Sequence, residues 1–189
     1  EALKPEFQTY IKNVLANAKM LAETLKNNGF KIYSGGTDTH LMLVDLRTFS
    51  VKGNLASESL CRANITFNKN GIPFDTEKPM ITSGIRLGSQ AATTRGFGLK
   101  EFEKVGELIT KVIKGLSENP DDNSKVENEV RDEVVNLCSN FPIYKNYVTR
   151  HVSRVTRHAS RVTCHVSRVT HHASRVTCHA SRVTRHASR

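Results

Sequence analysis

The sequence predicts an α/β fold, a two-layer sandwich in which a small sheet carries helices on one face. Helical periodicity of apolar residues occupies residues 5–28, 99–116 and about 122–140. Short apolar runs rich in Val, Ile and Leu lie between the first and second of these segments. This order of helix, strands, short helix, strands and helices is typical of helices packed against a single sheet.

The first helix is predicted over residues 5–28. Its apolar side chains recur three and four residues apart, which gives a long helix one face to bury. They are Phe7, Tyr10, Ile11, Val14, Leu15, Ala18, Leu21, Ala22 and Leu25. Pro5 suits the first turn of this helix, and Gly29 suits the left-handed residue just past its end.

Four segments are predicted as strands. FKIYSGG (30–36) reads as a short strand that stops at a glycine pair, and HLMLVDLR (40–47) as a strand buried on both faces. NITFNKNGIPFD (64–75) is a strand running into a turn-rich loop, and ITSGIRLG (81–88) is a further strand. A short helix is expected over 56–63, with Ser57 or Ser59 near its start.

The end of the chain is of a different kind. Six near-identical heptads of the type VTRHASR fill residues 148–189. Four of them offer one strong apolar residue, two offer a second valine, and none has an aromatic residue, which is too little burial to offset the entropy of ordering the segment. We therefore expect a domain over 1–144 and a disordered or poorly packed repeat tail over 145–189. A tandem repeat read through after loss of a natural stop is the simplest origin for it.

The net charge of +10 comes from this tail. Nine of the 28 basic side chains lie in residues 148–189 with no acidic one, which leaves 19 basic and 18 acidic side chains in residues 1–147. An arginine-rich tail would bind polyanions in a salt-dependent way. The seven tail histidines and two tail cysteines are too regularly spaced for a closed zinc site.

The cysteines and the hydropathy indicate a reducing, cytoplasmic setting. The four cysteines show no disulfide framework. No apolar run approaches the roughly 20 residues of a membrane span, and no signal peptide is recognisable. The sequence opens on Glu1 directly in helical sequence, so we expect a missing start.

The stretch ITSGIRLGSQAATTRGF (81–97) looks suited to an anion. It holds two arginines, three glycines, five hydroxyl side chains and no carboxylate. Arg86 lies between Gly84 and Gly88, where a ligand could approach the backbone, and a guanidinium can grip a carboxylate with two hydrogen bonds. Arg95 is a second candidate, although it could as easily cap a carboxylate within the fold.

His40 and the glycines before it carry a weaker signal. One histidine at the start of a buried strand is more often a turn or core residue than a catalyst. GGTDTH lacks the converging ligands of a metal site, and its glycines are not followed by the lysine and helix of a phosphate loop. No metal site is predicted.

Several motifs in order resemble one known family. FKIYSGGTDTHLMLVDLR, ANITFNKNGIPFD, ITSGIRLG and TTRGF, together with the opening EALKPEF, resemble the C-terminal portion of serine hydroxymethyltransferase. The resemblance covers residues 1–144 and ends near FPIY. It implies the C-terminal small domain of a fold-type I pyridoxal-phosphate enzyme, cytoplasmic and assembled as a homodimer or homotetramer.

The resemblance also implies roles for particular residues. The family interconverts serine and glycine with pyridoxal phosphate as cofactor and tetrahydrofolate as co-substrate. Arg86 matches the arginine that binds the amino acid's carboxylate, which would fix the orientation of the substrate. Asn70 matches a residue that hydrogen-bonds folate. Lys78, Pro79 and Met80 match a folate-contacting segment, in which the family often has an aromatic residue where Met80 stands.

The family's cofactor-binding lysine motif is absent from this sequence, as are its phosphate-binding glycines. Two function classes therefore stay open. The chain is either a hydroxymethyltransferase fragment, inactive without the missing portion, or a basic binding module whose tail associates with nucleic acid or other polyanions. The first is favoured, because the near-neutral body carries the specific motifs, and no specific nucleic acid or membrane partner is expected.

Overall fold

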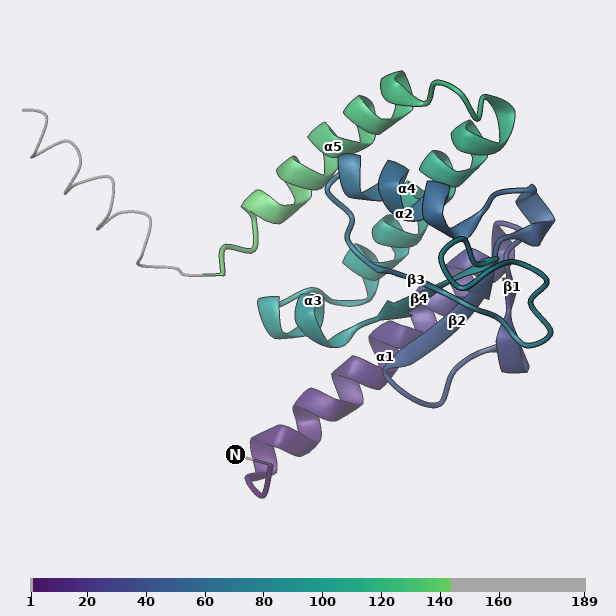
Figure 1. Cartoon of the computed structure of the whole chain (residues 1–189). Helices are drawn as coiled ribbons and strands as arrows, with labels where there is room; N and C mark the ends of the chain where they lie inside the picture. Colours follow the sequence, from purple (N-terminus) through teal and green to yellow (C-terminus); the bar gives the residue numbers. More distant parts are fainter. Residues whose placement is uncertain (1, 144–189) are drawn as a thin grey trace, which may run out of the picture. The chain divides into compact units, whose positions relative to one another are not determined.

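The computed structural model describes residues 2–143, of which those up to Pro142 belong to one compact unit (Figure 1). The helices are α1 (Pro5–Asn27), α2 (Gly53–Arg62), α3 (Gln90–Arg95), α4 (Leu99–Glu118) and α5 (Ser124–Ser139). The strands are β1 (Lys31–Ile32), β2 (Leu41–Asp45), β3 (Asn68–Asn70) and β4 (Gly84–Gly88), with single 3₁₀ turns at Tyr33–Gly35 and Arg47–Phe49.

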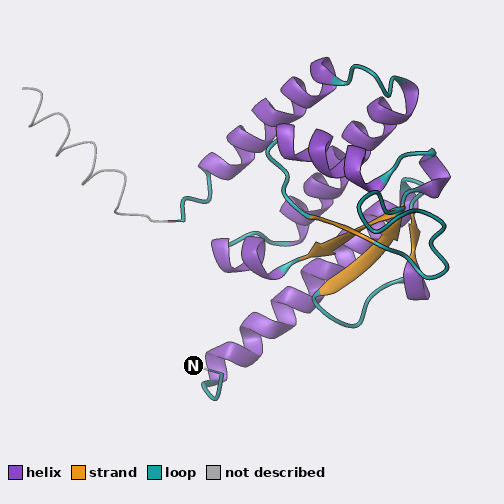
Figure 2. Ribbon diagram, viewed as in Figure 1, coloured by secondary structure: helices purple, strands orange, loops and turns teal. Residues whose placement is uncertain are grey.

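The four strands form one antiparallel sheet in the order β1-β2-β4-β3 (Figure 2). Met42 pairs with Leu87 and Val44 with Ile85, so these four side chains share one face of the sheet. All four are at most 5% exposed and belong to the main core cluster. The predicted α/β class, a small sheet with helices against it, is confirmed.

The helices fill the core from that face. Helix α1 packs mainly on α4, α2 contacts β3 and β4, and α5 packs on α4 and α2. The buried helical residues of the cluster are Ala18, Leu21, Ala22, Leu25, Ala56, Leu60, Phe102, Leu108, Ile109, Val112, Ile113, Leu116 and Val130. The spacing of three and four that predicted α1 and α4 is thus the spacing of their buried faces.

The prediction that the 40–47 strand is buried on both faces was wrong. Leu41 is 37% exposed and Leu43 is half-buried, whereas Met42 and Val44 are buried. Within residues 2–143 the helices contribute their core side chains to one side of the sheet. The apolar side chains on the other side therefore remain partly open to solvent, and we call that side the open face.

Other boundaries also differ from the predicted ones. Helix α2 begins at Gly53 rather than near Ser57, because the Gly53 and Asn54 amides donate to the carbonyls of Thr82 and Ile81, at 3.0 and 2.9 Å, and so hold the helix start against another segment. Strand β3 is confined to Asn68–Asn70, and α3 was not predicted at all. It is only six residues long and has a single buried side chain, that of Thr93, so it leaves no periodic apolar pattern.

The end signals of α1 were predicted correctly. Pro5 occupies its first turn, and Gly29 has a φ of +93°, the left-handed conformation that glycine adopts without strain. None of the helices in residues 2–143 combines the length and the apolar character needed to cross a membrane. The predictions made for the repeat tail fall almost wholly on residues 144–189, outside the described residues.

Candidate functional site

Arg86 occupies the middle of β4 and points to the open face. Its neighbours Ile85 and Leu87 are 0% and 5% exposed, and side chains alternate along a strand, so Arg86 must face the other way. Across the sheet it lies opposite Leu43 and Asn68. The apolar residues on either side of it therefore fix the direction of the guanidinium.

A hollow of about 390 Å³ lies beside this arginine, and we call it the Arg86 hollow. It is lined by Asn54, Ser57, Glu58, Phe67, Asn68, Lys69, Asn70 and Arg86. These residues come from the first half of α2, from β3 with the residue before it, and from β4. The ion pairs found within residues 2–143 do not include Arg86, so its guanidinium is not neutralised by any of the described carboxylates.

Two of the five predicted site residues meet in this hollow. Asn70 ends β3 and lines the hollow together with Arg86, while its Nδ2 donates to the Gly71 carbonyl at 2.7 Å. The other three do not line it. Lys78, Pro79 and Met80 lie in the loop of residues 71–83 that joins β3 to β4, where Met80 is 74% exposed.

The 71–83 loop is organised around Asp75. Its carboxylate accepts hydrogen bonds from the Ile72, Glu77 and Ser83 amides at 3.2, 3.0 and 2.9 Å and from Ser83 Oγ at 2.7 Å. Burial alone would raise the pKa of Asp75, but the Ser83 hydroxyl and the three amides lower it to about 2. Sequence reasoning missed this residue, although an aspartate after a Pro-containing turn is a typical acceptor for loop amides.

Asn54 is a second residue that sequence reasoning missed. It lines the Arg86 hollow, and its Oδ1 is buried without a hydrogen-bond partner among the described residues. Buried polar atoms are usually paired, so an unpaired acceptor at this place suits a ligand or water with a hydrogen to donate. No sequence motif distinguishes Asn54, because its placement depends on where α2 begins.

Gly84 and Gly88, on either side of Arg86, allow neighbouring atoms to pack closely against β4. A Cβ at Gly84 would come within 2.8 Å of the Val44 carbonyl oxygen and would collide with Ile72. One at Gly88 would lie 2.8 Å from Gln90 Oε1. The expectation that Gly84 opens the backbone to a ligand was therefore wrong, since its Cβ position is occupied by protein atoms, whereas the atom nearest to Gly88 is the movable end of the Gln90 side chain.

Arg95 is engaged within the fold. It donates to the backbone carbonyl of Phe141, from Nη2 to the Cys138 carbonyl at 3.0 Å, and from Nη1 to Cys138 Sγ at 3.3 Å. A cation at carbonyls that end a helix is favoured by the helix dipole. Of the two arginines in 81–97, only Arg86 is left to bind a ligand, and Arg95 instead joins α3 to the end of α5.

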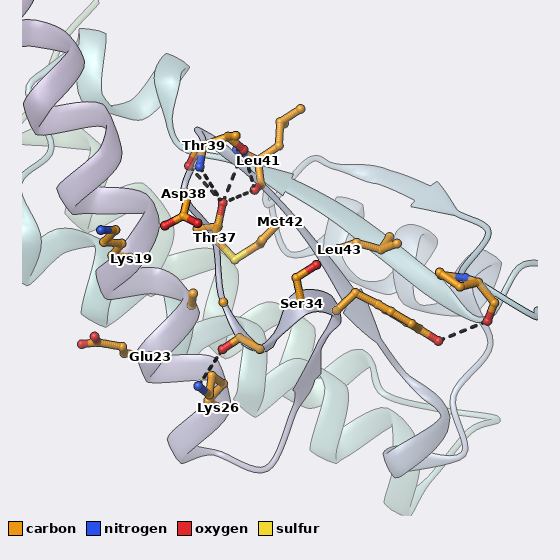
Figure 3. A pocket seen from close by; sticks show the side chains of 15 residues that line it. Lys19, Glu23, Lys26, Ser34, Thr37, Asp38, Thr39, Leu41, Met42 and Leu43 are labelled. Atoms are coloured by element: carbon orange, nitrogen blue, oxygen red, sulfur yellow. Dashed lines mark hydrogen bonds between the residues drawn. The ribbon is translucent and has the colours of Figure 1, made fainter.

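A larger hollow of about 730 Å³ lies between α1, the 33–39 loop and β2 (Figure 3). It is lined by charges of both signs, including Lys19, Glu23 and Lys26, and Lys26 Nζ donates to the Gly35 carbonyl at 2.7 Å. None of the predicted site residues lines it. His40 lies just outside, where its carbonyl accepts from the Ser89 amide, which agrees with its reading as a turn residue.

The described residues do not provide a site for a metal or for pyridoxal phosphate. No cluster of three His, Cys, Asp or Glu side chains able to hold a metal occurs within residues 2–143. The buried charged residues in that range are Asp45 and Glu127, so none of its lysines is buried. A lysine that forms an imine with a cofactor needs a desolvated amine, and the solvated lysines here do not fit that role.

Comparison with known proteins identifies the same family that the sequence motifs resemble. The family model described as serine hydroxymethyltransferase matches residues 1–109. The chain is 83% identical over 146 residues to serine hydroxymethyltransferase of Pelagibacter ubique (strain HTCC1062) and 63% identical over 145 residues to that of Marinomonas sp. (strain MWYL1). Each match covers 77% of this chain and 34% of the relative. The chain thus spans about a third of the length of the curated relatives it matches.

Proposed function

This chain belongs to the serine hydroxymethyltransferase family, and we propose that it supplies the substrate-carboxylate and folate contacts of an enzyme that converts serine and tetrahydrofolate to glycine and methylenetetrahydrofolate. Arg86 binds the carboxylate of serine or glycine. Asn70 and the Lys78–Met80 segment contact the folate. In this proposal the chain corresponds to the C-terminal portion of the enzyme.

One observation supports this function most directly. Arg86 projects from the centre of β4 to the open face, beside a hollow that it shares with Asn70. It pairs with none of the carboxylates described for residues 2–143. A guanidinium held on a strand without an internal partner is suited to a carboxylate from outside, because its planar fork matches the two carboxylate oxygens.

The role of Arg86 in the reaction is to bind and orient. Two parallel N–H···O bonds would fix both the position and the rotation of the amino acid's carboxylate. Fixing that group also fixes the torsion of the bonds at the α-carbon, which lowers the entropic part of the barrier. Sheet pairing on both sides of β4 makes the strand a rigid support for this contact.

The described residues do not fit pyridoxal phosphate, because none of the lysines in residues 2–143 is buried. We propose that the cofactor-binding lysine lies in a part of the enzyme that this chain does not match. Residues 1–189 alone would then be inactive, and the assembly of the enzyme as a homodimer or homotetramer in the cytoplasm belongs to the same proposal. The polyanion-binding alternative rests on the arginines of residues 148–189, outside the described residues.

The test combines this chain with the part of the enzyme that it does not match. The 146-residue matching segment of this chain would replace its counterpart in the 83% identical Pelagibacter ubique protein, and serine-to-glycine conversion would be measured with tetrahydrofolate and pyridoxal phosphate. We expect activity in this joined enzyme. We expect neither turnover nor an aldimine absorbance band from the isolated chain. A joined enzyme that folds, binds the cofactor and has no activity would contradict the proposal.

A further inference from the structure

The loop of residues 71–83 connects the two residues that share the Arg86 hollow. It leaves β3 directly after Asn70 and enters β4 two residues before Arg86. Apart from turns it has no regular structure, and Phe74 and Met80 at its surface are 96% and 74% exposed. Core packing alone therefore does not explain what gives this loop a defined shape.

Parts of the loop have backbone conformations that are costly for their residue types. Phe74 and Thr82 have φ values of 57° and 60°. Left-handed backbone is unusual for any residue with a Cβ, and for a β-branched threonine it is a clear outlier. Such conformations persist only where neighbouring contacts hold them. The contacts that hold this loop should therefore be identifiable.

Asp75 makes the contacts that tie the loop together. Its two carboxylate oxygens accept from Ile72 near the start of the loop, from Glu77 in the middle, and from both the amide and the hydroxyl of Ser83 at the end. Seven residues of the loop, 76–82, lie between Asp75 and Ser83 and include Lys78–Met80. One carboxylate thus closes the segment proposed to contact folate.

The enclosed segment is itself folded into a turn and anchored to α2. The Lys78 carbonyl accepts from the Ile81 and Thr82 amides at 2.9 and 3.0 Å. The Ile81 and Thr82 carbonyls accept in turn from the first amides of α2, those of Asn54 and Gly53. A change at Asp75 would therefore act on the Lys78–Met80 turn and on the α2 side of the Arg86 hollow.

We propose that Asp75 is the positioning residue of the folate contact: it holds the Lys78–Met80 turn in a fixed place relative to Asn70 and Arg86. This inference rests on the proposed function. Asp75 acts through the loop backbone and does not touch the substrate. Its carboxylate stays ionised, and so remains an acceptor for all four donors, at every pH at which an enzyme of this kind would work.

The kinetic test uses Asp75→Ala and Asp75→Asn in the joined enzyme. Loss of the four hydrogen bonds should raise the KM for tetrahydrofolate about 10- to 100-fold, the effect expected when binding groups are misplaced by around an ångström. Asp75→Asn keeps one acceptor oxygen and should have a smaller effect. The KM for serine should change less than the KM for tetrahydrofolate. Asp38→Asn, on an exposed loop of the same chain, is the matched control.

The kinetic outcomes separate this inference from the function on which it rests. If Arg86→Ala raises the KM for serine while Asp75→Ala leaves the KM for tetrahydrofolate unchanged, the function stands and the positioning role is wrong. A loss of kcat in proportion to the folded fraction, with both KM values unchanged, would also overturn the positioning role. If Arg86→Ala has no effect, the proposed function is wrong.

A second measurement uses the full chain without added parts. Amide hydrogen exchange in Asp75→Ala should speed up at least about tenfold at Ile72, Glu77 and Ser83, whose N–H groups lose their acceptor. Amides in the middle of α4 should exchange as before. Unchanged protection at these three amides would overturn the inference even if the joined enzyme could not be made.

Discussion

Glu127 of α5 accepts two hydrogen bonds from the guanidinium of Arg62 on α2, with Nε 2.6 Å from Oε2 and Nη2 2.7 Å from Oε1. Glu127 is 3% exposed, and Ser59 Oγ also donates to its Oε1 at 2.7 Å. The hydrogen bond from Arg62 is the largest influence on the pKa of Glu127 and lowers it, although burial by itself would raise that pKa. This pair joins α5 to α2, the helix that lines one side of the Arg86 hollow.

Replacing Glu127 should destabilise the domain and change its response to acid. Glu127→Gln removes the charged acceptor from a pair whose carboxylate is buried but whose arginine side chain is 53% exposed, and we expect a loss of about 1–2 kcal/mol in the free energy of unfolding at pH 7. Because the folded pKa lies below the unfolded one, the native protein gains this stability above the unfolded pKa and loses it as the pH falls through the folded pKa. The difference between the two proteins should therefore shrink in acid.

Urea unfolding of both proteins at several pH values measures this difference. Glu133→Gln is the matched control, because Glu133 pairs with Lys104 and Lys111 at the surface and should cost at most about 1 kcal/mol. A Glu127→Gln protein as stable as the original at pH 7, or a difference that grows in acid, would show that the pair does not stabilise the fold.

Gly84→Ala should destabilise the sheet next to Arg86. The added methyl group would lie 2.8 Å from the Val44 carbonyl oxygen and would collide with Ile72. Overpacking of this kind typically costs about 1–3 kcal/mol. Gly71→Ala, at the other end of the loop that enters β4, is the control, since its Cβ would have ordinary contact with Asp75 Oδ2 at 3.9 Å. Thermal unfolding compares the two, and equal melting temperatures would contradict the packing seen at Gly84.

Removing residues 145–189 should leave the domain as stable as before. The last described residues are held by contacts within residues 2–143: Phe141 packs on Phe97 with ring centroids 4.8 Å apart, and Arg95 binds the carbonyls of Phe141 and Cys138. Calorimetry of the full chain and of a version ending at Tyr144 should give melting temperatures within about a degree. A melting temperature lower by several degrees in the shorter protein would show that the repeats contribute to the fold.

The parts of the fold that sequence predicted best are those decided by periodicity. Helices α1, α4 and α5 were predicted within about two residues at each end, because three or more turns of regular apolar spacing leave little choice of buried face. The strands were predicted as segments but with wrong ends. Sequence does not show where the pairing between neighbouring strands stops. Strand β3 ends at Asn70, directly before the 71–83 loop whose amides bind the Asp75 carboxylate.

The candidate site was predictable only in part, for a related reason. Arg86 was singled out because it lies in a stretch without carboxylates and matches the family's carboxylate-binding arginine, whereas its direction is decided by the buried neighbours Ile85 and Leu87. Asn54 and Asp75 could not be singled out, since the first depends on where α2 begins and the second on hydrogen bonds to amides up to eight residues away. For Arg95 the sequence left a ligand role and a role within the fold open, because its partners at Cys138 and Phe141 lie far along the chain.

The most direct test of the account concerns the partner of Arg86. In the joined enzyme, Arg86→Ala should raise the KM for serine by about 30-fold or more, because truncating one member of a charge pair that the bound substrate would bury costs about 2–5 kcal/mol. Arg86→Lys should recover only part of this, since an ammonium cannot make both parallel hydrogen bonds. Lys31→Ala, which removes another cation from the open face, should have no such effect. A KM for serine that is unchanged in Arg86→Ala would contradict the claim that this arginine binds the substrate carboxylate.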